Sequence, residues 1–211
     1  MLKLHVIASQ ITNLTDARYF AARGIDYLSF NLDAGSESAI SPQQLNAIKE
    51  WVEGPKVIGA FGLQDIDEIK TAVNYIELEA VQLSMFSDVA VISTALDVPV
   101  FVEVIAESAV LSDVFELIDT HSSSVDYFIL DLSRNNIVFE TIDQVQQDRL
   151  KEICTQQKVF LNLSDQVDSI LQILNEVQPY GLVLSGGAEE KVGFKSFDEL
   201  DDILDVLEIE E

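Results

Sequence analysis

The sequence repeats one unit eight times: a short run of apolar and β-branched residues, a turn, and an amphipathic stretch with helical spacing. Several of the runs, such as VFVEVI and YFILDL, are apolar almost throughout. Such runs are typical of strands that are buried on both faces of a parallel sheet. The expected strands are Leu2–Ala8, Tyr27–Leu32, Lys56–Phe61, Ala80–Ser84, Pro99–Ile105, Asp126–Leu132, Lys158–Leu163 and Gly181–Ser185.

The number and size of the units favour a closed barrel over an open sheet. Eight units in 211 residues leave about 26 residues for each, which is near the lower end of the range for a (β/α)8 barrel. We therefore predict an α/β fold, a (β/α)8 TIM barrel, in one compact domain that spans residues 1–211.

Capping residues agree with the division into units. Asn13 and Ser41, the latter followed by Pro42, are expected N-caps, while Gly24 and Gly54 stand where helices should end. The acidic segment at residues 198–211 keeps Leu and Ile at helical spacing, so we predict a terminal helix with one solvated face.

The charge balance excludes several classes of partner. Twelve Lys and Arg against 37 Asp and Glu give a net charge of −25, which repels nucleic acid and anionic membranes. One cysteine, Cys154, and two histidines, His5 and His121, leave little material for a disulfide or a metal centre. We expect no metal or other cofactor. The chain carries no recognisable signal peptide or membrane span, so we expect a cytoplasmic protein.

In a barrel of this kind the chemistry lies at the carboxyl ends of the strands. Asp131 ends the apolar run YFILD and is the first catalytic candidate, although it could instead cap its loop or pair with Arg134. The segment Leu184–Gly187, LSGG, ends the last strand, and small residues there allow backbone N–H groups to bind a phosphate. The alternative is a tight turn between strand and helix.

Acidic residues are frequent at the same ends of the strands. An electronegative mouth that binds a small molecule is therefore expected, and a divalent cation held by carboxylates is the alternative. These residues are Asp33, Glu103, Glu107, Asp131 and Asp165.

The segment Val6–Asp16, VIASQITNLTD, followed by ARGIDYLSF, resembles the opening of phosphoribosylanthranilate isomerase, an enzyme family of tryptophan biosynthesis. The resemblance continues in the same order through all eight units. It is carried by SPQ at 41–43, VIGAF at 57–61, AVQL at 80–83, DYFILD at 126–131, PYG at 179–181, LSGGAE at 184–189 and GFK at 193–195.

The resemblance implies an Amadori rearrangement of phosphoribosylanthranilate. In the family, an Asp on strand six is the general acid and a Cys on strand one is the general base, while an Arg after strand two and backbone amides after strands seven and eight hold the substrate. Asp131 has the position of the acid and Ser9 that of the base. The phosphate-binding loop after strand eight corresponds to Ser185, Gly186 and Gly187.

Several positions depart from the family pattern. Ser9 replaces the Cys, and a serine hydroxyl needs a partner to act as a base near neutral pH. The segment Gly35–Ser38 lacks the Arg, and Leu161–Leu163 lacks the glycines of strand seven.

Together these losses predict a catalytically degenerate barrel, a possible pseudoenzyme, whose mouth binds a different ligand or partner. The alternatives are an active phosphoribosylanthranilate isomerase with an unusual base, either Ser9 or a rim carboxylate such as Glu103, and another sugar chemistry on the same barrel. The sequence makes no prediction of oligomeric state.

Overall fold

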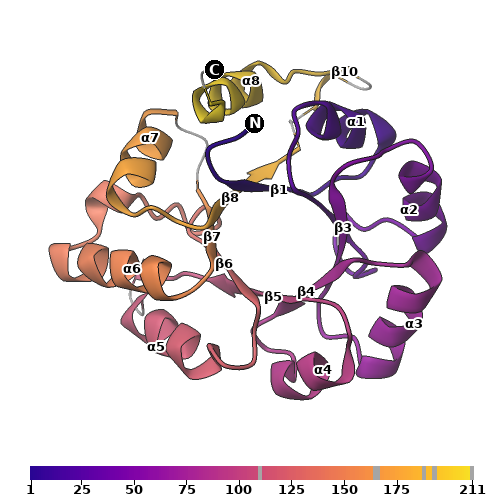
Figure 1. Ribbon diagram of the computed structural model, residues 1–211, viewed down its shortest axis with the longest axis horizontal. Helices are drawn as coiled ribbons and strands as arrows, with labels where there is room; N and C mark the ends of the chain where they lie inside the picture. Colours follow the sequence, from indigo (N-terminus) through magenta and orange to yellow (C-terminus); the bar gives the residue numbers. More distant parts are fainter. Residues whose placement is uncertain (109–110, 164–166, 187–188, 192–193, 210–211) are drawn as a thin grey trace.

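The eight strands β1–β8 close into a barrel in sequence order, and the predicted (β/α)8 fold is confirmed. The computed structural model describes residues 1–108, 111–163, 167–186, 189–191 and 194–209. Figure 1 shows the ring of strands inside a ring of helices, with the two chain ends near α8. Every neighbouring pair of strands in the ring is parallel, including β1 with β8.

The strands of the barrel agree with the expected runs to within three residues. They are β1 His5–Ser9, β2 Tyr27–Asn31, β3 Lys56–Phe61, β4 Ala80–Ser84, β5 Val100–Ile105, β6 Tyr127–Asp131, β7 Val159–Asn162 and β8 Gly181–Ser185. The largest difference is at β1, because Leu2 bridges Glu208 instead of extending the strand. A further two-stranded sheet, β9 Glu189–Lys191 with β10 Phe194–Lys195, was not expected from the sequence.

The helices alternate with the strands as predicted. They are α1 Leu14–Ala22, α2 Pro42–Lys49, α3 Ile66–Ile76, α4 Val89–Ala95, α5 Leu111–His121, α6 Gln144–Gln156, α7 Val167–Glu176 and α8 Asp198–Leu207, and the 3₁₀ helix η2 is Phe139–Thr141. Asn13 and Ser41 are N-caps, and Ser41 forms a reciprocal capping box with Gln44. Gly24 directly follows the C-cap of α1, as expected, with a φ of 71° that glycine adopts without strain. Gly54, with a φ of 110°, does not end a helix, because α2 ends at Lys49 and Gly54 lies in the loop beyond it.

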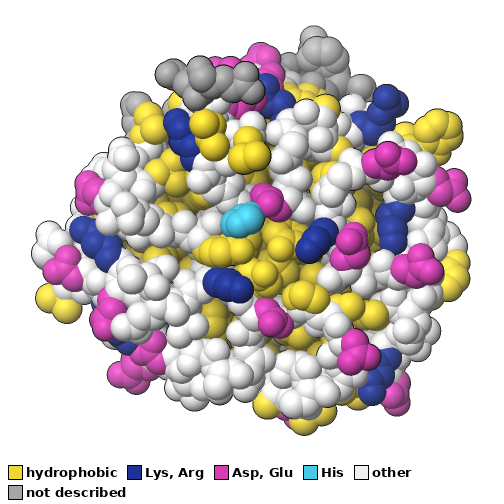
Figure 2. Space-filling model, in the orientation of Figure 1, with side chains coloured by type: hydrophobic (Ala, Val, Ile, Leu, Met, Phe, Trp, Pro, Cys, Tyr) yellow, Lys and Arg dark blue, Asp and Glu magenta, His cyan; other side chains and the backbone are white. Residues whose placement is uncertain are grey.

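Two apolar layers build the core. Outward-facing strand residues pack against the helices, and α8 contributes Leu200, Ile203 and Leu204 to that layer. A second cluster fills the ring of strands from within and includes Phe101 and Phe160. Figure 2 accordingly shows hydrophobic side chains across the centre of the ring, around one histidine. Within the described ranges, no helix has both the length and the apolar character needed to cross a bilayer.

Gly181 lies where the inner cluster leaves no room for a side chain. A Cβ at this position would collide with the carbonyl oxygen of His5 and with the ring of Phe160. We expect Gly181→Ala to lower the free energy of unfolding by about 1–3 kcal/mol, the usual cost of overpacking a core. Denaturant unfolding measures the change.

The matched control is Gly35→Ala in the exposed loop after β2, where the nearest atom would be Asp33 Oδ1 at 3.4 Å. This variant should stay within about 0.5 kcal/mol of the unmodified protein. Equal losses for the two variants would contradict the tight packing at Gly181.

Candidate active site at the carboxyl ends of the strands

A pocket of about 530 Å³ opens at the carboxyl ends of the strands, where sequence analysis expected it. The strand register arranges its inward-facing residues in levels, each drawn from alternate strands. The floor consists of Ser29, Gln82, Ile129 and Val183, the middle level of Ser9, Ala60, Glu103 and Asn162, and the upper level of Asn31, Ser84 and Asp131. The pocket is therefore mostly polar above a floor that is half apolar.

Asp131 lies in the pocket wall at the end of β6 and is only 2% exposed. Its Oδ1 accepts hydrogen bonds from the Ser133 hydroxyl at 2.8 Å and from the Arg134 backbone N–H at 3.0 Å. Its Oδ2 lies 3.7 Å from Arg134 Nε. Asp131 therefore caps its loop and pairs with Arg134, and it also lines the pocket, while its catalytic role stays a prediction.

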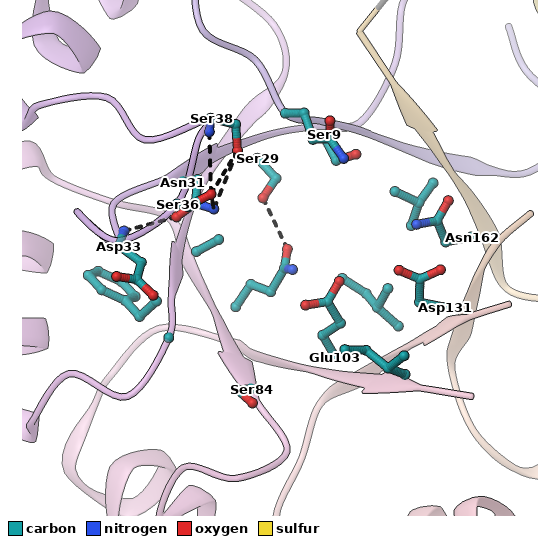
Figure 3. A pocket seen from close by; sticks show the side chains of 18 of the residues that line it. Ser9, Ser29, Asn31, Asp33, Ser36, Ser38, Ser84, Glu103, Asp131 and Asn162 are labelled. Carbon is teal, nitrogen blue, oxygen red and sulfur yellow. Dashed lines mark hydrogen bonds between the residues drawn. The ribbon is translucent and has the colours of Figure 1, made fainter. Parts of the chain in front are cut away.

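Glu103 reaches the same pocket from the neighbouring strand β5. Burial raises the pKa of its carboxyl group; Arg134 lowers it, Asp131 raises it further, and a hydrogen bond with Gln82 lowers it. Figure 3 shows the Glu103 and Asp131 side chains pointing into the pocket. Two carboxyl groups in one partly closed site can divide proton donation and acceptance between them.

The raised pKa of Glu103 predicts an effect on stability. As pH rises above the pKa of the unfolded chain, the unfolded state releases this proton before the folded state does, so the free energy of unfolding falls. Glu103→Gln removes this titration. We expect the variant to exceed the unmodified protein in melting temperature at pH 7, with a gap that narrows on acidification to about pH 4. A gap that widens on acidification would contradict the direction of the pKa change.

Ser9 lies in the pocket wall but has no base beside it in the described part of the chain. Its Oγ donates to the carbonyl oxygen of Leu184 at 3.3 Å and lies 3.3 Å from the hydroxyl oxygen of Ser185. Neither partner can accept the serine proton near neutral pH, so these contacts give Ser9 no activation as a base.

The first residue after β8 already makes a backbone hydrogen bond. The Gly186 N–H donates to the carbonyl oxygen of Ser9 at 3.2 Å, so it continues the strand ladder and is not free for an anion. A Cβ on Gly186 would lie 3.1 Å from Asp16 Oδ2, which accounts for the small residue. Gly187 lies outside the described residues, and phosphate binding at Ser185, Gly186 and Gly187 stays a prediction.

Of the expected acidic residues, Asp33, Glu103 and Asp131 line the pocket. Glu107 is exposed and does not line it, and Asp165 lies outside the described residues. Glu37 adds a carboxylate that sequence analysis did not single out. Among the pocket-lining residues described, Arg134 carries the positive charge. In the described ranges, no three His, Cys, Asp or Glu side chains gather as a metal site would require.

Ser29 and Gln82 are the polar residues of the floor that sequence analysis missed. Ser29 is 3% exposed, and its hydroxyl donates to Gln82 Oε1 at 3.0 Å. The signal that could have found them is strand alternation, because each lies two residues before a polar residue at its strand end, Asn31 and Ser84 respectively.

The chain is similar to known proteins over nearly its whole length. The family model for N-(5'-phosphoribosyl)anthranilate (PRA) isomerase matches residues 7–206. The N-(5'-phosphoribosyl)anthranilate isomerase of Chlorobium phaeobacteroides is 25% identical, over 95% of this chain and 94% of that protein. The crystal structure of the isomerase from Thermotoga maritima has a TM-score of 0.76 at 20% identity, covering 95% of this chain and 97% of that chain.

A further isomerase structure holds reduced 1-(o-carboxyphenylamino)-1-deoxyribulose 5-phosphate. It has a TM-score of 0.72 at 19% identity, covering 95% of this chain and 96% of that chain. The structural likenesses support the barrel fold, and the family model spans nearly the whole chain. This chain belongs to the PRA isomerase family.

Proposed function

We propose that the protein is an active isomerase of its family's type, in which Glu103 is the general base and Asp131 the general acid. The proposal takes up the alternative of an unusual base, and the family match over residues 7–206 supports it more than it supports a degenerate barrel. The observation that carries it is the pair of carboxyl groups from β5 and β6 in one pocket, with a raised pKa at Glu103.

The substrate proposed is phosphoribosylanthranilate, bound at the barrel mouth. Its phosphate is proposed to lie toward Ser185 at the end of β8, because the N–H of the next residue, Gly186, is already donated to Ser9. A relative that binds a reduced arylamino-deoxyribulose 5-phosphate supports this class of ligand. The half-apolar floor and the hydroxyl and amide groups of the walls are suited to a sugar chain.

The reaction needs a proton donor at the ring oxygen and a base at the neighbouring carbon C2′. Asp131 donates a proton to the ring oxygen, the bond from C1′ to that oxygen breaks, and the nitrogen lone pair forms a C1′=N iminium ion. Glu103 then removes the C2′ proton, and the electron pair moves into a C1′=C2′ double bond as the nitrogen becomes neutral. Loss of the proton from the 2′-hydroxyl and protonation of C1′ give the ketose, so no atoms are gained or lost.

The environment of the Glu103 carboxyl group supports its role as base. A carboxylate with a raised pKa is a stronger base than an ordinary one, which brings Glu103 closer to the strength that removal of a carbon-bound proton demands. Arg134 acts on both groups: it lies 3.7 Å from Asp131 Oδ2 and lowers the pKa of Glu103. It can therefore balance the negative charge as the proton moves.

The experiment is turnover of phosphoribosylanthranilate by the purified protein, with the ketose product quantified by chromatography. It is paired with complementation of a tryptophan auxotroph that lacks the isomerase. Turnover and growth are expected, and both should depend on Glu103. Soluble, folded protein without turnover would contradict the proposal and favour the degenerate barrel.

A further inference from the structure

The pocket floor contains a chain of two polar residues, Ser29 and Gln82, that leads toward Glu103. Ser29 on β2 donates to Gln82 Oε1 on β4 at 3.0 Å, and Gln82 in turn lowers the pKa of the Glu103 carboxyl group on the neighbouring strand β5. Figure 3 shows the bond from Ser29 as a dashed line across the floor of the pocket. The two polar residues occupy a level where barrels of this fold normally pack branched apolar side chains.

The side-chain amide of Gln82 has one favourable orientation between Ser29 and Glu103. An ionised Glu103 can only accept hydrogen bonds, so Gln82 must turn its NH2 group toward it. The amide oxygen of Gln82 then faces Ser29, whose hydroxyl is the donor in that contact. A reversed amide would place Oε1 against a carboxylate oxygen, which is repulsive. Ser29 therefore holds the amide in the orientation that suits an ionised carboxylate.

The register explains how residues from two non-adjacent strands meet. β3 separates β2 from β4, but side chains of alternate strands share a level inside the barrel. Ala60 is the β3 residue paired with Gln82, and its small side chain leaves space above the contact. Ser29 is only 3% exposed, so its hydroxyl bond is well shielded from water.

We infer that Gln82 and Ser29 are positioning residues for proton transfer by Glu103: Gln82 orients the carboxylate, and Ser29 orients Gln82. The inference rests on the proposed role of Glu103 as base. Arg134 and Asp131 are the charged groups that also act on Glu103, from the end of β6 and the loop after it. Gln82 and Arg134 both favour the ionised form of the Glu103 carboxyl group, whereas burial and the charge of Asp131 favour its protonated form.

The test uses Gln82→Met, Ser29→Ala and Ser29→Thr, with Ser93→Ala on α4, which does not line the pocket, as control. Met keeps the length of Gln without its donor, and Thr keeps the hydroxyl of Ser. The first readout is the titration midpoint of the Glu103 carboxyl carbon by NMR on unliganded, ¹³C-Glu-labelled protein, assigned with Glu103→Gln. This readout needs no turnover. The second readout is kcat for phosphoribosylanthranilate against pH.

We expect the Glu103 midpoint to move to higher pH in Gln82→Met, to move less in Ser29→Ala, and to return toward its original value in Ser29→Thr. The acidic limb of the kcat profile should move with it. At pH values below the midpoint, kcat should fall about tenfold for every whole pH step by which the midpoint rises. Ser93→Ala should match the unmodified protein in both readouts.

An unchanged midpoint in folded Gln82→Met would overturn the inference, whatever the turnover. A changed Glu103 midpoint with an unchanged pH profile of kcat would also overturn the inference, because Gln82 and Ser29 would then act on a carboxyl group that transfers no proton. If the Glu103 midpoint changes but the protein has no turnover at all, Gln82 and Ser29 do act on Glu103. In that case it is the proposed function that is contradicted.

Discussion

Replacing Glu103 with Gln is expected to lower kcat for phosphoribosylanthranilate by about 10²–10⁴, the usual contribution of a positioned general base. The amide keeps nearly the same size, but it cannot take up the C2′ proton. Glu103 is half-buried in the pocket wall, where its carboxyl group faces the bound substrate in the proposed mechanism. The measurement is steady-state turnover across pH.

The matched control is Glu107→Gln, which makes the same chemical change at an exposed acid four residues further along the chain. It should leave kcat within a small factor of the original value. Circular dichroism and melting temperature confirm that both variants are folded. Equal turnover of the two variants would show that Glu103 is not the base.

Asp131→Asn should produce a second loss of about 10²–10⁴ in kcat, because the general acid is removed. The Asn side-chain oxygen can still accept the bonds from Ser133 and the Arg134 N–H, so the loop after β6 should keep its conformation. Ring opening then lacks its proton donor. The change is measured by turnover and by the affinity for the reduced product analogue. The affinity should fall by a much smaller factor than kcat.

The control for this variant is Asp113→Asn, in the exposed first turn of α5. The double variant Glu103→Gln/Asp131→Asn should lose less than the product of the single losses, since the two groups serve successive steps of one reaction. Retention of most of the turnover in Asp131→Asn would remove Asp131 from the mechanism.

The fold was predictable because the alternation of buried strands and amphipathic helices is present in every unit. The N-caps at Asn13 and Ser41 depend on neighbouring residues only, and both were correctly predicted. The strand β9 and its partner β10 were not expected, since three- and two-residue strands leave no periodic signal. The start of β1 was wrong by three residues because Leu2 finds its partner at the far end of the chain, at Glu208.

The site was predictable where a residue ends a strand. Asp131 and Glu103 were both placed at the mouth, since the carboxyl ends of parallel strands meet at one face. The contact between Ser29 and Gln82 was not predictable, because it depends on how far each strand is staggered against the next. The same holds for Gly186, whose N–H is taken by Ser9 across the join between the first and last strands.

Chemical rescue tests the central claim, that Glu103 removes the C2′ proton, most directly. Glu103→Ala leaves a space for a small carboxylate, and single-turnover conversion of phosphoribosylanthranilate is measured with increasing formate or acetate. The account predicts saturable recovery in Glu103→Ala, with Ser9→Ala active without any added carboxylate. Loss of turnover in Ser9→Ala, together with no recovery of Glu103→Ala by either anion, would contradict it.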